Sequence, residues 1–141
     1  MKRTASAAWR GELKDGKGLL TTQSGVLSDT PYSFGTRFED GLGTNPEELI
    51  AAAHAGCFSM ALAMMLGEAG IRLEQIDTAR VRQPRTDGGG FAITAVHLEV
   101  RVWAPSADPE AFAVVAERAK AGCPVSKVLN AAITMTANLR D

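Results

Sequence analysis

A single long apolar stretch lies near the middle of the chain, from residue 49 to residue 67. The residues just before it are typical of a helix start, with Asn45 as the N-cap, Pro46 at the first helical position and two acids in the first turn. Gly70 is placed to end the helix. The pattern therefore predicts a helix that runs from Pro46 to about Glu68.

Shorter segments of alternating apolar and polar residues lie on both sides of this helix and predict β-strands. Three strands are expected before the helix, at residues 5–10, 19–24 and 32–38. Two more are expected after it as a hairpin, at residues 76–83 and 91–103 with a glycine-rich turn at 87–90. A last strand is expected at residues 133–139.

The same alternation predicts which side chains share a face of each strand. In the strand at 91–103, one face carries Val96, Leu98, Val100 and Val102. In the strand at 32–38, aromatic residues would take one face and Arg37 would take the other, together with Ser33, Gly35 and Glu39.

Two further helices are expected after the hairpin. Asp108-Pro109-Glu110 repeats the N-cap and proline pattern and begins a helix to about Ala121. Cys123-Pro124 begins a second, shorter helix. Strands grouped near both ends of the chain around a central apolar helix predict an α+β fold with a mostly antiparallel sheet.

Chain length and charge narrow the class of protein. A chain of 141 residues without linker or repeat predicts a single domain over residues 1–141. The net charge is −1 and the basic residues are scattered, which disfavours nucleic acid or an anionic membrane as partner. The central stretch is long enough to span a bilayer. A helix that is apolar on every side is nevertheless typical of a buried core, so we expect no membrane span.

The first nine residues carry positive charge but no apolar segment of a secretory signal. We therefore expect a cytoplasmic protein. Because that compartment keeps thiols reduced, a purely structural disulfide is not expected.

The chain has two cysteines in distinctive settings: Cys57 lies inside the apolar helix, and Cys123 directly precedes Pro124. Two thiols can form a structural crosslink, ligate a metal or act in redox catalysis. They form no Cys-x-x-Cys pair, and His54 and His97 have no ligand spacing, so we expect no metal site. We expect no bound cofactor either, since no phosphate-binding glycine loop is present.

His54 lies three residues before Cys57, so the two side chains would be neighbours on one helix. A hydrolase would also need a group that orients the histidine and an oxyanion pocket, and neither is readable in the sequence. A buried histidine that donates to a backbone carbonyl is the favoured interpretation of His54.

A peroxide-reducing thiol reacts as the thiolate, so its pKa must be lowered. Cys57 lies in mid-helix among apolar neighbours, where burial alone raises the pKa of a thiol. If Cys57 is reactive, it needs a cation from elsewhere in the fold, and an arginine suits that role. Cys123 would be the N-cap of its helix, where free N–H groups favour an anion. These local effects leave open which thiol attacks.

Several segments together resemble the OsmC/Ohr family, the osmotically inducible and organic hydroperoxide resistance proteins. They are Ser24-Gly-Val-Leu27, Thr36-Arg-Phe-Glu39, Gly43-Thr-Asn-Pro-Glu-Glu-Leu-Ile50, Ala52-Ala-His-Ala-Gly-Cys-Phe-Ser-Met60, Leu66-Gly-Glu-Ala-Gly70 and Ala119-Lys-Ala-Gly-Cys-Pro-Val-Ser126. The segments cover nearly the whole chain in order. The position of Arg37 in the second segment resembles the OsmC branch more than the Ohr branch.

The resemblance implies an activity and a site. It implies a thiol-dependent peroxidase that reduces organic hydroperoxides and, less efficiently, hydrogen peroxide. Cys57 would be the peroxidatic cysteine and Cys123 the resolving one, and they would form a disulfide. Arg37 would activate Cys57, and Glu47 would pair with Arg37. Without the resemblance, Arg37 is an ordinary solvated charge and Glu47 an ordinary first-turn acid.

The resemblance also implies an assembly and a reductant. The family fold is an intertwined α+β homodimer, in which curved, mostly antiparallel sheets enclose two central helices. The reductant would be a dithiol, in particular a lipoyl group on a carrier protein. The apolar residues Phe58, Met60 and Met64 near Cys57 would suit an alkyl hydroperoxide tail, although core packing is the favoured interpretation of each.

Glu47 and Cys57 are ten residues apart, which is about 15 Å along a straight helix. One Arg37 side chain cannot easily pair with Glu47 and also contact Cys57 of the same unbroken helix. Either the helix bends sharply, or the Arg–Glu pair comes from a second subunit. We prefer a composite site at a dimer interface.

A second class of function stays open at this point. The chain could be a thiol redox sensor or a small-ligand-binding dimer that is oxidised without turning over. A sensor is expected to carry a readout element such as a DNA-binding helix, and the sequence shows none.

Overall fold

A computed structural model describes residues 2–82 and 92–140. Its contacts divide the chain into two compact units, Met1–Ile50 and Ala51–Asp141, and each is described by itself. The predicted turn at 87–90 and the ends of its two strands at Gln83 and Phe91 lie outside the described residues.

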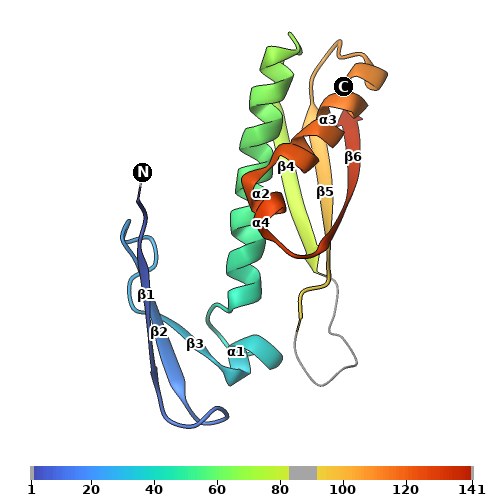
Figure 1. The fold of residues 1–141 in the computed structure, drawn as a ribbon. Helices are drawn as coiled ribbons and strands as arrows, with labels where there is room; N and C mark the ends of the chain where they lie inside the picture. Colours follow the sequence, from blue (N-terminus) through green and yellow to red (C-terminus); the bar gives the residue numbers. More distant parts are fainter. Residues whose placement is uncertain (1, 83–91, 141) are drawn as a thin grey trace. The chain divides into compact units, whose positions relative to one another are not determined.

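The first unit holds a small antiparallel sheet with strand order β1-β2-β3 (Figure 1). Its strands are β1 (Ala5–Arg10), β2 (Lys17–Thr22) and β3 (Thr30–Ser33). The first prediction, 5–10, is confirmed, and the second strand begins and ends two residues earlier than predicted. The rings of Trp9 on β1 and Tyr32 on β3 pack 5.4 Å apart between centroids, across the central strand.

The predicted strand at 32–38 is wrong beyond Ser33, where the short helix α1 (Phe34–Phe38) begins. A capping box starts this helix: the Ser33 hydroxyl accepts from the Thr36 N–H, and the Thr36 hydroxyl accepts from the Ser33 N–H. These two bonds satisfy backbone groups that a strand would have paired with a neighbour. Arg37 therefore lies on a helical turn and not on a strand face.

Helix α2 (Pro46–Glu68) confirms the predicted central helix. Asn45 is its N-cap, since its side-chain oxygen accepts from the Glu48 N–H at 2.8 Å. Gly70 follows with a φ of +72°, a left-handed conformation that favours glycine after a helix. Residues 46–50 of this helix belong to the first unit and residues 51–68 to the second.

The second unit contains a sheet of strand order β4-β5-β6 and two further helices. The elements are β4 (Gln75–Arg82), β5 (Ala95–Trp103), α3 (Pro109–Gly122), α4 (Pro124–Val128) and β6 (Ala132–Arg140). β4 and β5 are antiparallel, whereas β5 and β6 are parallel. A parallel pair needs a long crossover, and α3 and α4 provide it. The α+β fold class is confirmed, and three of the four strand pairings among the described residues are antiparallel.

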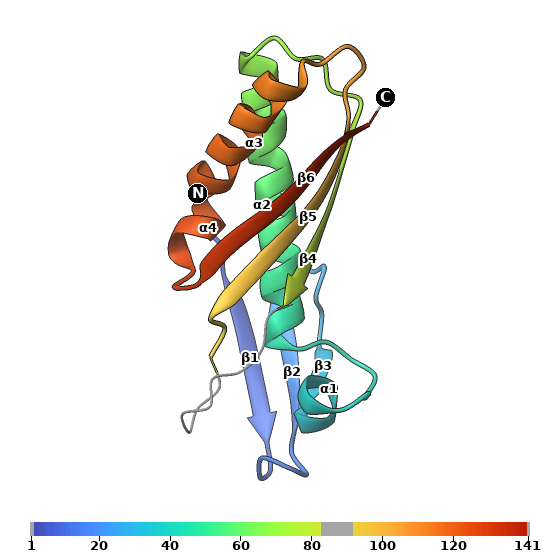
Figure 2. The same ribbon diagram turned by 90° about the vertical axis from the view of Figure 1, so that its right-hand side faces the viewer.

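The core of the second unit lies between the sheet and the helices α2 and α3, which cover the same face of the sheet (Figure 2). The predicted face of β5 is confirmed, because all four valine and leucine side chains on it are fully buried: Val96, Leu98, Val100 and Val102. Helix α2 adds Phe58, Leu62 and Leu66, and helix α3 adds Phe112 and Val115. Each such side chain contributes about 1.5–3 kcal/mol when buried.

Helix α2 is buried on one side only, with His54, Phe58, Leu62 and Leu66 toward the core. Core packing is thus confirmed for Phe58, but it is wrong for Met60 and Met64, which are 76% and 57% exposed. By length and composition alone, α2 is apolar enough to cross a membrane. Its inner side packs on the sheet of the second unit through Phe58, Leu62 and Leu66.

Candidate active site

The two thiols meet in the second unit. The Sγ atoms of Cys57, in the middle of α2, and Cys123, at the end of α3, are 3.1 Å apart. Both are free thiols, Cys57 half-buried and Cys123 fully buried. A disulfide is about 2.05 Å long, so an approach of about 1 Å would join them. Cys57 is thus the sulfur that a reagent from solvent can reach.

The junction of two helices holds Cys123 in place. Its N–H donates to the Ala119 carbonyl and ends α3, while its own carbonyl accepts from the Lys127 N–H at the start of α4. Gly122 just before it lies close to α2: a Cβ at Gly122 would be 2.9 Å from the Cε of Met65. The small residue lets α3 bring Cys123 close to α2.

Hydrogen bonds favour a negative charge on Cys123. Burial raises the pKa of Cys123, but hydrogen bonds from the Ser126 N–H, the Cys57 thiol, the Ser126 hydroxyl and the Val125 N–H outweigh it and lower the pKa. This direction agrees with the prediction for the N-cap position, although Cys123 makes no side-chain capping hydrogen bond to α4. The 3.1 Å contact taken alone has Cys123 donating to Cys57, whereas the pKa directions of the two thiols need the hydrogen on Cys57. Because the N–H groups converge on Cys123, we assign the hydrogen to Cys57.

Cys57 has the opposite environment. Burial raises the pKa of Cys57, a hydrogen bond from the Val125 N–H lowers it, and the adjacent Cys123 raises it again, so the net direction is upward. The prediction from the apolar neighbours is confirmed. None of these causes is a cation, so activation of Cys57 requires one in addition to the groups that act on it here.

An ion pair lies in the first unit, where Arg37 of α1 meets Glu47 in the first turn of α2. The Arg37 Nη2 and Nε donate to Glu47 Oε1 at 2.6 and 2.9 Å, and Nε also lies 3.2 Å from Oε2. This forked geometry is specific to arginine. The Glu47 side chain is 17% exposed and that of Arg37 is 37% exposed, so the guanidinium keeps access to a further partner.

Asn45 positions this ion pair, and sequence reasoning identified it only as a helix cap. Its side-chain nitrogen donates to the Thr36 carbonyl at 3.1 Å while its oxygen caps α2. One amide therefore ties the turn that carries Arg37 to the helix start that carries Glu47. The capping signal was visible in the sequence, but the link to Thr36 depends on the unpredicted helix α1.

The four residues named from the sequence thus form two pairs, one in each unit. Cys57 and Cys123 are in contact in the second, and Arg37 and Glu47 are in contact in the first. Sequence reasoning missed one partner of the thiol site, Ser126, whose hydroxyl lies 2.8 Å from the Nε2 of fully buried His54. One sequence feature pointed to Ser126: it follows Cys123 by three residues, the same spacing that separates His54 from Cys57.

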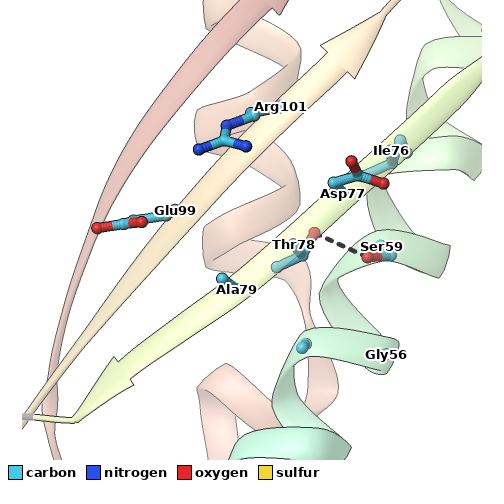
Figure 3. A pocket seen from close by; sticks show the side chains of 9 residues that line it. Gly56, Ser59, Ile76, Asp77, Thr78, Ala79, Glu99 and Arg101 are labelled. Carbon is cyan, nitrogen blue, oxygen red and sulfur yellow. Dashed lines mark hydrogen bonds between the residues drawn. The ribbon is translucent and has the colours of Figure 1, made fainter.

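A separate groove of about 480 Å³ lies along α2 and the edge strand β4, and neither cysteine lines it (Figure 3). The Ser59 and Thr78 hydroxyls lie 2.8 Å apart across it. Its outer part carries the charged side chains Asp77, Glu99 and Arg101. The rest of its lining is small or apolar: Ala55, Gly56, Ile76 and Ala79. Within residues 2–82 and 92–140, no group of three or more metal-ligating side chains is present.

Residues 39–138 match the family described as OsmC-like protein. The chain belongs to the OsmC family. It is 52% identical over 140 residues to Peroxiredoxin OsmC of Escherichia coli strain K12, which covers 99% of this chain and 97% of that protein. It is 30% identical over 124 residues to Organic hydroperoxide resistance protein OhrB of Bacillus subtilis. That match covers 87% of this chain and 89% of that protein. The family resemblance found in the sequence is confirmed.

Solved structures of OsmC and Ohr proteins share the fold. The crystal structure of Bacillus subtilis OhrB matches with a TM-score of 0.67 at 27% identity, covering 96% of this chain and 98% of that chain. An OsmC-like protein from Mycoplasma pneumoniae matches with a TM-score of 0.74 over 100% and 99% of the chains. At 13% identity, this second likeness concerns the fold alone. The predicted OsmC-like fold is confirmed, while the homodimer stays a prediction.

Proposed function

We propose that this chain is a thiol-dependent peroxidase that reduces organic hydroperoxides, and hydrogen peroxide less efficiently. The single observation that carries the proposal is the contact between a half-buried Cys57 and a fully buried Cys123, 3.1 Å apart. The names of the relatives in Escherichia coli and Bacillus subtilis support the reaction class. The reaction needs no bound cofactor, because both redox groups are side chains.

The reaction has two oxidative steps. The Cys57 thiolate attacks the terminal peroxide oxygen, the O–O bond breaks, and the alkoxide takes up a proton and leaves as an alcohol. Cys57 is then a sulfenic acid. Cys123 attacks that sulfur as a thiolate, the S–O bond breaks, and the hydroxide leaves as water after protonation. A Cys57–Cys123 disulfide remains.

A dithiol completes the cycle by returning the disulfide to two thiols, and it becomes a disulfide itself. The accessible sulfur is Cys57, because Cys123 is fully buried. A reduced lipoyl group on a carrier protein has the required dithiol and a flexible arm. We place the protein in the cytoplasm, where such reductants are kept reduced.

The active unit is proposed to be a homodimer of single OsmC-like domains, each spanning residues 1–141. The outer side of α2 supports this assembly, because it is an exposed stripe of small and apolar residues at helical spacing: Ala52, Gly56, Met60, Met64 and Gly67. Among the described residues, nothing lies within 4 Å of a Cβ built at Gly56 or Gly67. A second copy of α2 fits such a stripe, and Met60 and Met64 would then border an apolar site for the hydroperoxide tail.

In that dimer, Arg37 paired with Glu47 supplies the cation that Cys57 needs, and the spacing along α2 favours a pair from the partner subunit. Mixing Arg37→Ala chains with Cys57→Ser chains is then expected to restore activity, because each heterodimer has one complete site. The Cys57→Ser homodimer is expected to show only the background rate, and the Arg37→Ala homodimer a rate more than about 100-fold below wild type. Steady-state assays on heterodimers purified with two different tags test this. Inactive heterodimers would place Arg37 and Cys57 of one site in the same subunit.

The proposed function itself is tested by steady-state reduction of cumene hydroperoxide or a lipid hydroperoxide with dihydrolipoamide. The wild-type protein is expected to turn over many times, and Cys57→Ser to show only the background rate. Hydrogen peroxide in the same assay measures the preference for organic substrates. Oxidation of one equivalent without turnover, under any dithiol, would support the redox sensor instead.

A further inference from the structure

We infer that His54 and Ser126 form a positioning pair for Cys123, in which His54 donates to the Ser126 hydroxyl and Ser126 donates to the Cys123 sulfur. The inference rests on the proposed function, since it assigns the groups that control the second thiol of that reaction. Neither residue contacts the peroxide in this assignment. Their effect is on disulfide formation and on its reduction.

The spacing of two residue pairs brings this chain of hydrogen bonds together. His54 and Cys57 are three residues apart on α2, and Cys123 and Ser126 are three residues apart at the start of α4. The two pairs face each other through a hydrogen bond of 2.8 Å and a sulfur–sulfur contact of 3.1 Å. The His54–Ser126 contact therefore helps to align α2 with α4 so that the sulfurs of Cys57 and Cys123 meet.

The hydrogen-bond directions follow from the number of hydrogens available. The Ser126 hydroxyl has one hydrogen, lies 2.8 Å from His54 Nε2 and is one of the groups that lower the pKa of Cys123. When Cys123 is a thiolate it has no hydrogen to donate, so in that state the hydroxyl hydrogen points to Cys123 and Nε2 of His54 carries the second hydrogen. This assigns the tautomer of His54. Because His54 is fully buried, water does not compete for that bond.

The arrangement serves both halves of the cycle. When Cys123 attacks the sulfenic acid, a stabilised thiolate is available at neutral pH. When a dithiol attacks Cys57 in the disulfide, Cys123 is the leaving group, and a thiol of lower pKa leaves faster. Loss of the Ser126 hydroxyl should slow both steps and leave the attack of Cys57 on peroxide in place.

The test separates the steps in the Ser126→Ala variant by stopped-flow mixing with one equivalent of cumene hydroperoxide. Sulfenic acid formation is expected to stay within about twofold of wild type. Disulfide closure at pH 7 is expected to slow by about tenfold, the scale of one hydrogen bond to a charged group. The pH midpoint of the closure step should move upward. Ser126→Thr, which keeps the hydroxyl, should restore both values.

A readout independent of peroxidase activity uses Cys57→Ser, in which Cys123 is the sole thiol. Its pKa, followed by the ultraviolet absorbance of the thiolate, is expected to rise when Ser126→Ala is added and also when His54→Gln is added. An unchanged Cys123 titration and an unchanged closure rate in Ser126→Ala would overturn the inference. Equal slowing of sulfenic acid formation and closure would also overturn it, because that is general damage to the fold. A wild-type protein without peroxidase activity would instead refute the proposed function. The Cys123 titration would then still test the role of His54 and Ser126.

Discussion

A Cys123→Ser variant is expected to become a sulfenic acid at Cys57 once and then to stop. The first step needs only Cys57, whereas the disulfide needs the second sulfur that now lies 3.1 Å away. Sustained turnover should fall by more than about 100-fold, the scale of losing a group that reacts covalently. Trapping with dimedone and mass spectrometry measures the sulfenic acid, and the dihydrolipoamide assay measures turnover.

The matched control for this variant is Cys57→Ser, which should form neither a sulfenic acid nor a disulfide. Both variants replace a thiol by a hydroxyl, so comparing where each protein forms a sulfenic acid shows which sulfur attacks the peroxide. A trapped sulfenic acid at Cys123 of the Cys57→Ser protein, with none at Cys57 of the Cys123→Ser protein, would reverse the assignment. That outcome is chemically reasonable, because Cys123 is the thiol whose pKa is lowered in the second unit.

An Arg37→Ala variant is expected to slow the first oxidation step by more than about 100-fold at pH 7. Burial raises the pKa of Cys57, so without a cation little thiolate is present at neutral pH. The guanidinium is also a forked donor for the departing alkoxide, and one such donor contributes about 100- to 1,000-fold. The defect should shrink as pH rises through the higher pKa of Cys57. At high pH, where Cys57 is a thiolate in both proteins, the remaining defect should be the part that comes from the missing donor to the alkoxide.

Two variants separate charge from geometry in that result. Arg37→Lys keeps the positive charge but not the fork, so it should recover only part of the rate. Glu47→Gln removes the carboxylate that holds the guanidinium at 2.6 Å and should leave a smaller, less pH-dependent defect. An Arg37→Ala protein that oxidises as fast as wild type at pH 7 would remove Arg37 from the site.

Local signals predicted the elements that carry the thiols. Asn45 and Pro46 define the start of α2, and Asp108 defines the start of α3 by accepting from the Ala111 N–H. Proline after Cys123 predicted the junction of α3 and α4. These signals lie within a few residues of the feature that they determine, so a sequence reveals them.

Two parts of the site were not predictable in the same way. The segment that carries Arg37 alternates like a strand, and the capping box of Ser33 and Thr36 overrides that alternation. The exposed Met60 and Met64 look like core residues, because the pattern of a buried helix is the same whether its own chain or a second copy covers it. Contacts between distant segments, such as His54 with Ser126, have no local signal.

The most direct measurement is the pKa of Cys57 in the assembled protein, read from the pH dependence of its alkylation in the Cys123→Ser background. Our account predicts a value well below that of free cysteine, about 8.5. Adding Arg37→Ala should then raise it above that of free cysteine. A Cys57 that titrates like free cysteine or higher, with no response to the loss of Arg37, would contradict the account.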